Sequence, residues 1–466
     1  MSNTAGDSQY EEKLREKQAG ERRGVIHRSK SVKEGMRYPC ALLLLCLGLV
    51  GCQQTQPRPE IVPPEYVGLL APKTPAPLLQ KGDRLAICGD SITEQKKYSL
   101  LMEAYIVAAR SDLHVTVRQH GWSGEQAGGF LKRIDNDVLR FKPTIATTCY
   151  GMNDFRYVPQ DDAIAATYRA NQTAVVRKFK EAGARVVLGS SGTIHSVPPW
   201  VKSAKGTWQE LNLALLNFRN INIEVAQAEQ VAFADVYWPM LVKGHETRAK
   251  YGEGFKLEGN DGVHPGWAGH VMMATAFLEG LGLRGDVGQI DVDLASGQAN
   301  ARYGQRIMKS EAGVISLRSF RIPASFEPGD VTKDGSIAAG VALADFQKKL
   351  NRLTLRVAGA KTAQVKVTWG EASKIFTAAE LAKGVNLAAV FPQNPTSPTF
   401  AKIWKAVEEK QAYETKQIKT LFRSPDAKKD MEAVVKSSQV EFDRLAAALQ
   451  ATIKPVDSTL KVEEVR

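Results

Sequence analysis

Residues 84–93 have the sequence Arg84-Leu85-Ala86-Ile87-Cys88-Gly89-Asp90-Ser91-Ile92-Thr93, which is typical of the first strand and turn of an α/β domain. Residues 84–88 are a short apolar run, which predicts a buried β-strand. Residues 98–110 are rich in helix-forming residues, so Ser91 is expected where a strand turns into a helix. In an open α/β sheet, ligands bind at the carboxyl ends of the strands, where the positive ends of helix dipoles also lie. Ser91 is therefore a candidate functional residue.

Two later blocks carry matching chemistry. Residues 144–150 predict another strand, and Gly151-Met152-Asn153-Asp154 leave its end. Further on, Asp261-Gly262-Val263-His264-Pro265 sets Asp261 and His264 three residues apart, so the two side chains can face the same way. Asp261 can then hold one imidazole nitrogen while the other points at Ser91. With the Asn153 amide added, these groups can make a weak nucleophile attack an ester carbonyl.

The segment around these blocks alternates strand and helix patterns. Apolar runs that predict strands recur at residues 115–117, 184–189 and 231–236, with helical stretches between them and short links. This alternation predicts an α/β domain over residues 81–285, built on a parallel sheet flanked by helices. Cys88 and Cys149 fall near the ends of predicted central strands, and we expect them to be buried thiols.

The blocks resemble those of the SGNH (GDSL) hydrolase superfamily, which has a Gly-Asp-Ser block, a glycine block, a Gly-x-Asn-Asp block and an Asp-x-x-His block. The glycine block is matched by Gln119-His120-Gly121-Trp122-Ser123-Gly124-Glu125, although the family more often has Asn where this chain has Gln119. The resemblance covers roughly residues 82–285. It implies a flavodoxin-like parallel sheet sandwiched by helices, the SGNH hydrolase fold.

The resemblance also implies roles for individual residues. Ser91 would be the nucleophile, His264 the base and Asp261 the residue that orients the base. The oxyanion hole would consist of the main-chain N–H groups of Ser91 and Gly124 and the side-chain amide of Asn153. The expected activity is that of a serine esterase acting through an acyl-enzyme, with short-chain and carbohydrate-linked esters as the leading substrates. No metal or organic cofactor is expected.

Two other classes of hydrolase do not fit the residues of this chain. An α/β-hydrolase needs a G-x-S-x-G elbow, which the chain lacks. A two-metal phosphoesterase needs clustered ligands, and no His/Asp cluster accompanies His264 and His270. The net charge of +12 comes with no nucleic-acid motif, so no nucleic-acid partner is expected. Three alternatives stay open: an acyltransferase that moves acyl groups onto envelope sugars, a lipid-ester lipase or lysophospholipase, and a non-catalytic binding lipoprotein.

The amino terminus predicts a location. From Met36 the chain has a basic residue, an apolar core and then Leu49-Val50-Gly51-Cys52. The core is too short to span a bilayer and matches a signal peptide. The last four residues resemble the lipobox of bacterial lipoproteins, which implies lipidation of Cys52 and a lipid anchor in the cell envelope, on the periplasmic or outer face. Residues 1–52 are thus expected to be a dispensable extension plus signal peptide, and residues 53–80 a Pro-rich tether.

The chain changes character after residue 285. Residues 286–375 contain β segments such as 353–357 and 363–369, which predict a small β-rich accessory module. Residues 376–466 are expected to be a C-terminal helical region. Apolar residues recur there at helical spacing over 399–422 and 425–454, which predicts an αα-hairpin.

Overall fold

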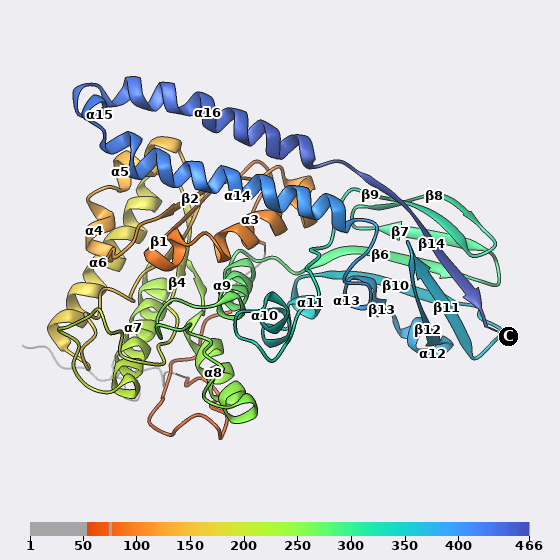
Figure 1. Ribbon diagram of the computed structural model, residues 1–466, viewed down its shortest axis with the longest axis horizontal. Helices are drawn as coiled ribbons and strands as arrows, with labels where there is room; N and C mark the ends of the chain where they lie inside the picture. The colour runs from red at the N-terminus through yellow and green to blue at the C-terminus, as the bar shows by residue number, and fades with distance from the viewer. Residues whose placement is uncertain (1–53, 74–76, 466) are drawn as a thin grey trace, which may run out of the picture. The chain divides into compact units, whose positions relative to one another are not determined.

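The structure, a computed structural model, describes residues 54–73 and 77–465 (Figure 1). The predicted extension, the signal peptide and the predicted lipidation site Cys52 lie outside these residues. Within the described part of the chain, no helix is both long and apolar enough to cross a membrane.

A parallel five-stranded sheet with the order β2-β1-β3-β4-β5 is the centre of the first domain (Figure 1). This is the flavodoxin-like order, and the predicted α/β fold class is confirmed. Most strand residues are buried, because helices cover both faces of a parallel sheet. The strands are β1 Arg84–Gly89, β2 Thr116–Gly121, β3 Ile145–Cys149, β4 Arg185–Gly189 and β5 Ala232–Ala234.

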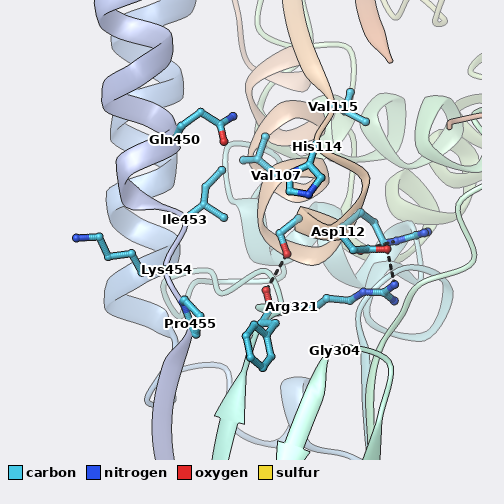
Figure 2. Close-up of a pocket in the computed structure, with 13 residues that line it drawn as sticks. Val107, Asp112, His114, Val115, Gly304, Arg321, Gln450, Ile453, Lys454 and Pro455 are labelled. Atoms are coloured by element: carbon cyan, nitrogen blue, oxygen red, sulfur yellow. Dashed lines mark hydrogen bonds and ion pairs between the residues drawn. The ribbon is translucent and has the colours of Figure 1, made fainter. Parts of the chain in front are cut away.

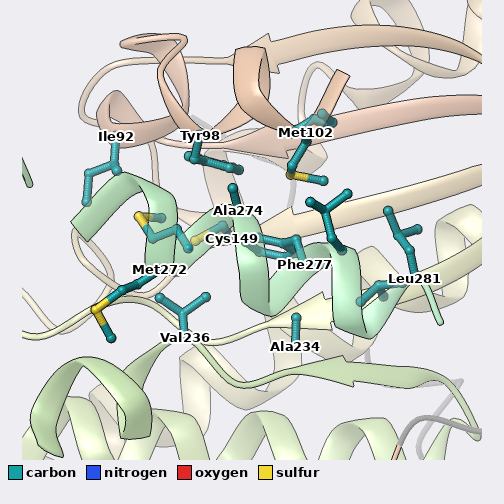
Figure 3. Close-up of a cluster of buried hydrophobic side chains, with 14 of the residues drawn as sticks. Ile92, Tyr98, Met102, Cys149, Ala234, Val236, Met272, Ala274, Phe277 and Leu281 are labelled. Carbon is teal, nitrogen blue, oxygen red and sulfur yellow. The ribbon is translucent and has the colours of Figure 1, made fainter. Parts of the chain in front are cut away.

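The helices of this domain follow the strands in alternation. They are α2 Ser91–Glu94, α3 Tyr98–Ala109, α4 Ala127–Leu131, α5 Ile134–Asp137, α6 Asp162–Glu181, α7 Trp208–Ala228, α8 Tyr237–Tyr251 and α9 Trp267–Gly280. Helix α9 packs closely on the sheet, as Figure 3 shows for Phe277 and its neighbours. The Phe277 ring stacks on Tyr98 at 5.6 Å. A Cβ at Gly189 would lie 2.5 Å from that ring, so glycine at the end of β4 permits this close packing.

The accessory module contains two sheets around a separate core. Their strand orders are β13-β10-β6-β7 and β12-β11-β14-β9-β8, and Trp369 is buried within the core. The strands are β6 Asp286–Asp293, β7 Gln298–Arg302, β8 Gln305–Glu311, β9 Val314–Ser319, β10 Arg352–Ala358, β11 Gln364–Trp369, β12 Ala372–Thr377, β13 Val385–Asn386 and β14 Val456–Glu464. Short helices accompany them: α10 Ile337–Leu343, α11 Phe346–Lys349, α12 Ala378–Lys383 and α13 Leu387–Val390.

Two segments differ from the sequence-based expectation. The C-terminal region is not all helical, because β14 pairs with β9 and β11 and buries Leu460 and Val462 in the module. Part of the predicted tether is packed rather than free. Tyr66 is buried, the Leu69 N–H donates to Asn220 Oδ1 at 3.0 Å, and Arg219 donates to the Leu69 carbonyl at 2.8 Å. These few contacts fix a proline-rich segment on α7.

The predicted αα-hairpin is present. It consists of α14 Ser397–Lys419 and α16 Met431–Thr452, joined through α15 Pro425–Lys429. Helix α14 packs on α3 and along the edge strand β2. It brings a buried charge cluster to this contact: Lys410 Nζ lies 3.0 Å from Glu103 Oε1, pairs with Glu414, and donates to the Val117 carbonyl at 2.8 Å.

A hollow of about 450 Å³ lies where α3, the end of α16 and the module meet (Figure 2). Arg321 pairs there with Asp112 at 2.7 Å, and Ser111 Oγ donates to the Phe320 carbonyl at 2.7 Å. Lys454 points away from Arg321 in Figure 2, so these two cations do not converge on one point. The contacts join the module to the sheet domain.

The buried cluster on α14 should dominate the stability of this contact. Burial by itself would lower the pKa of Lys410, but the two carboxylates raise it above its usual value. Lys410→Met leaves Glu103 and Glu414 buried without a cation, and we expect a loss of about 3–5 kcal/mol in the free energy of unfolding, measured by urea denaturation.

The deficit of Lys410→Met should depend on pH. Burial already raises the pKa of Glu103 to about 7, although Lys410 opposes this shift. Without Lys410, the folded-state pKa of Glu103 rises further above the unfolded value of about 4.3, so the variant loses more stability as the pH rises above about 4.3. The deficit is therefore expected to be larger at pH 8 than at pH 5. Lys405→Met, an exposed position on the same helix, is the control and should change little. Equal deficits for the two variants would contradict the prediction.

Candidate active site

Ser91 lies at the first turn after strand β1, as predicted. Asp90 caps helix α2, because its Oδ1 accepts a hydrogen bond from the Ile92 N–H at 3.0 Å. The Ser91 side chain is partly exposed, and its Oγ lies 2.8 Å from His264 Nε2. The residues are 173 positions apart in the chain, so this contact is a product of the fold.

His264 is held by Asp261 in the loop before α9. His264 Nδ1 lies 2.8 Å from Asp261 Oδ2, while Asp261 Oδ1 accepts the N–H groups of Val263 at 2.9 Å and His264 at 2.8 Å. Burial by itself would raise the pKa of Asp261, but these hydrogen bonds together hold it below its usual value. An ionised Asp261 favours the tautomer with hydrogen on Nδ1, which leaves Nε2 free to accept a proton from Ser91.

The loop after β4 adds one wall beside this pair. The His195 N–H donates to the Gly262 carbonyl at 3.0 Å, which ties the two loops together. The Trp200 ring lies 5.8 Å from the His264 ring, and Trp200 is 49% exposed. The His195 ring faces Glu253 and Trp208 instead of Ser91. Trp200 is therefore the aromatic side chain that flanks the imidazole.

Asn153 lies in the loop that leaves β3 and contacts the loops that leave β1 and β2. Its Nδ2 donates to the Glu125 carbonyl at 3.2 Å and lies 3.4 Å from Asp90 Oδ2. The next residue, Asp154, shapes both neighbouring loops by accepting the N–H groups of Gly151 at 3.0 Å and Ala127 at 2.9 Å. The Asn153 amide is thus directed toward the first turn of α2.

Gly124 lies in the loop between β2 and α4, and its φ of +74° favours glycine. A hollow of about 520 Å³ borders this loop and is lined partly by Trp122, Gly124 and Lys132. Sequence reasoning placed Gly124 through its block. The sequence did not predict that two cations of the C-terminal hairpin, Lys419 and Arg423, lie 5.0 and 5.1 Å from the Trp122 ring of this loop, because no local pattern connects positions so far apart in the chain.

Three carboxyl groups next to the candidate site residues, those of Asp90, Glu125 and Asp154, are buried. Burial raises the pKa of Asp90 to about 7 and that of Asp154 to about 6. Burial also raises the pKa of Glu125, which pairs with Arg133 at 2.6 Å. Each of these groups accepts hydrogen bonds within the fold, so their role is structural.

Two cysteines and a histidine near the site are buried in the core. Cys88 and Cys149 are free, buried thiols, and burial raises both pKa values. His270 lies on α9, where its Nε2 is 3.1 Å from Gln95 Oε1, and burial lowers its pKa to about 3. It is therefore a neutral core residue near neutral pH.

Comparisons with known proteins bear on the family and the fold of the chain. Residues 87–272 match the model of the GDSL-like Lipase/Acylhydrolase family. No curated protein matches the chain. A solved gut microbial diltiazem-metabolizing enzyme is 22% identical, with a TM-score of 0.67 over 84% of this chain and 100% of that one. This likeness shows a shared fold that extends beyond the sheet domain.

Two smaller structures match only part of the chain. An acetylxylan esterase from Geobacillus stearothermophilus is 21% identical and covers 44% of this chain and 96% of its own, with a TM-score of 0.36. An α/β hydrolase enzyme from the metagenome of Lake Arreo, Spain, is 21% identical over 44% of this chain and 98% of its own, with a TM-score of 0.36.

Proposed function

Because the chain belongs to the SGNH (GDSL-type) hydrolase superfamily and is a hydrolase of ester bonds, we propose that it is a serine esterase with Ser91, His264 and Asp261 as its triad. The observation that carries the proposal is the continuous chain of hydrogen-bond distances: 2.8 Å from Ser91 Oγ to His264 Nε2 and 2.8 Å from His264 Nδ1 to Asp261 Oδ2. A serine, an imidazole and an orienting carboxylate in this order activate a hydroxyl nucleophile.

The proposed reaction has two halves. Ser91 Oγ attacks the ester carbonyl while His264 Nε2 takes its proton, and the resulting oxyanion accepts hydrogen bonds from the Ser91 N–H, the Gly124 N–H and the Asn153 amide. The bond to the leaving oxygen breaks as His264 returns the proton to it, which releases the alcohol and leaves an acyl-serine. Water then attacks the acyl carbon with His264 again as base, and release of the acid returns the proton to Ser91.

We further propose that the alcohol part of the substrate carries a ring, as a sugar ester does, and that the acyl group is short. His264 protonates the leaving oxygen, so the alcohol part lies beside the imidazole. Trp200 flanks His264 and is 49% exposed. A large exposed indole beside the leaving group offers an apolar face on which a ring can stack.

Trp200→Ala should separate ring-bearing from simple alcohols. We expect KM for acetylated xylooligosaccharides and p-nitrophenyl acetate to rise roughly 2- to 10-fold, the range of one aromatic contact, with ethyl acetate unaffected. Trp200→Phe is the matched control. It keeps an aromatic ring, so its KM should stay close to that of the native enzyme.

The length of the acyl group is tested by steady-state kinetics on a series from p-nitrophenyl acetate to palmitate. Higher kcat/KM for palmitate would favour a lipase, and faster acyl transfer to added sugars than to water would favour an acyltransferase.

Asn153→Ala should lower kcat roughly 10²–10³-fold, about 3–4 kcal/mol, with KM nearly unchanged. The reason is that the amide hydrogen bond strengthens as the carbonyl oxygen becomes an oxyanion. Asn300→Ala, an exposed asparagine of strand β7 in the module, is the control and should leave kcat unchanged. If Asn153→Ala instead raises KM and spares kcat, Asn153 binds the substrate and is not part of the oxyanion hole.

We also propose that the enzyme is attached to the bacterial cell envelope through a lipid on Cys52, which the pattern Leu49-Val50-Gly51-Cys52 supports. Cys52→Ala should abolish incorporation of labelled fatty acid and release active enzyme from the membrane fraction. Cys46→Ala, a cysteine inside the apolar core, should leave labelling intact. A mature protein that retains Met1 in its mass spectrum would refute the anchor.

A further inference from the structure

The loop that contains Gly124 donates two hydrogen bonds from its backbone to the segment around Ser91, one to the residue before the Asp90-Ser91 turn and one to the end of helix α2. The Trp122 N–H donates to the Gly89 carbonyl at 2.9 Å, directly before the Asp90-Ser91 turn. The next N–H, that of Ser123, donates to Glu94 Oε2. Glu94 is the last residue of helix α2, whose first residue is Ser91. Helix α2 therefore has the proposed nucleophile as its first residue. Its last residue, Glu94, accepts a hydrogen bond from Ser123, the residue before Gly124.

A lysine from the C-terminal hairpin forms an ion pair with Glu94. Lys419, the last residue of α14, places its Nζ 2.7 Å from Glu94 Oε1 and 2.8 Å from Glu94 Oε2, although the two residues are 325 positions apart. The pair is partly shielded, with 28% of the Lys419 side chain and 22% of the Glu94 side chain exposed. Lys419 thus orients both carboxylate oxygens, one of which accepts the Ser123 N–H.

The Trp122 side chain is held by cations of the same hairpin. Lys419 Nζ lies 5.0 Å from the centre of the Trp122 ring, and the Arg423 guanidinium lies 5.1 Å from it. Arg423 is itself fixed by Asp137 at 2.6 Å. Together with the Arg133 guanidinium, 5.0 Å from the same ring, these contacts restrict the indole. The hairpin therefore holds Trp122 directly and Ser123 through Glu94.

Helix α14 also fixes the strand that leads into the loop. The Gln119 N–H donates to Glu414 Oε2 at 2.9 Å, and Gln119 Nε2 lies 3.3 Å from Thr415 Oγ1. Gln119 Oε1 in turn accepts the Gly121 N–H. Glutamine at this position, where the related pattern more often has asparagine, is long enough to reach both Thr415 and the strand end. The hairpin therefore contacts the glycine block at its beginning and in its middle.

We propose that Lys419 is a positioning residue for the oxyanion hole, and that the αα-hairpin is a working part of the active site. The inference rests on the proposed function, in which the Gly124 N–H stabilises the oxyanion. A backbone donor acts only when it points at the place where the charge develops, and a glycine at positive φ leaves the loop conformational freedom. The Lys419–Glu94 pair removes that freedom by fixing the Ser123 peptide.

The test is the kinetics of Lys419→Met with p-nitrophenyl acetate on the full chain. We expect kcat to fall roughly 10- to 100-fold, the scale of a small misplacement of a catalytic group, with KM within about 2-fold. The thermal midpoint should stay within about 4 °C, because a partly exposed ion pair contributes little stability. Lys419→Arg should restore most of kcat. Lys416→Met, an exposed lysine one turn earlier that forms no ion pair within the described residues, is the matched control and should keep kcat.

Glu94→Gln provides an independent arm, since glutamine can still accept the Ser123 N–H but loses the ion pair. It should also lower kcat, and the double variant should be no worse than Lys419→Met alone, because both changes remove the same ion pair and Lys419→Met in addition removes the contact with the Trp122 ring. Unchanged kcat in Lys419→Met or Glu94→Gln, or additive losses in the double variant, would overturn the proposal. Ser91→Ala is measured in parallel. If it retains turnover, the proposed function fails, whereas an inactive Ser91→Ala beside a fully active Lys419→Met rejects only the positioning role.

Discussion

The register of three parallel strands is the constraint on which the site depends. Gly89 at the end of β1 pairs with Gly121 of β2 on one side and with Cys149 of β3 on the other. The three loops that leave these strands therefore start at the same level of the sheet. A Cβ at Gly121 would lie 2.2 Å from the Glu94 nitrogen, so the β2 loop passes directly against helix α2. If the register slipped by one residue, the loop with Ser91 would no longer start level with the loops that contain Gly124 and Asn153.

The base reaches this edge through the packing of a distant helix. Helix α9 packs on the sheet through Phe277, whose ring lies against Gly189. The loop before α9 contains His264, which lies within hydrogen-bond distance of Ser91. Hydrogen bonds within that loop orient Asp261, so the base is positioned before any substrate arrives. The C-terminal hairpin supplies the corresponding support on the opposite side, over β2. The proposed machinery is thus fixed by a core contact on one side and by ion pairs on the other.

Local patterns predicted most of the fold and the candidate site. The apolar run before Ser91 and the alternation of strands and helices set the sheet, and the four short blocks named the residues that the structure brings together. Strand β14 was not predicted, although its nine residues alternate in burial, because it directly follows a long helix and pairs with β9 and β11 much earlier in the chain. The packing of Tyr66 and the Lys419–Glu94 pair were also beyond prediction, because each joins segments far apart in the chain through one or two side chains.

Trapping the acyl-enzyme would identify the nucleophile of this protein. The protein is mixed with p-nitrophenyl acetate, quenched in acid within milliseconds, digested and analysed by mass spectrometry. We expect one acetyl group, on the peptide that contains Ser91, appearing together with a burst of p-nitrophenol. Acetylation of another residue in place of Ser91, or steady turnover by a Ser91→Ala variant, would show that Ser91 is not the nucleophile.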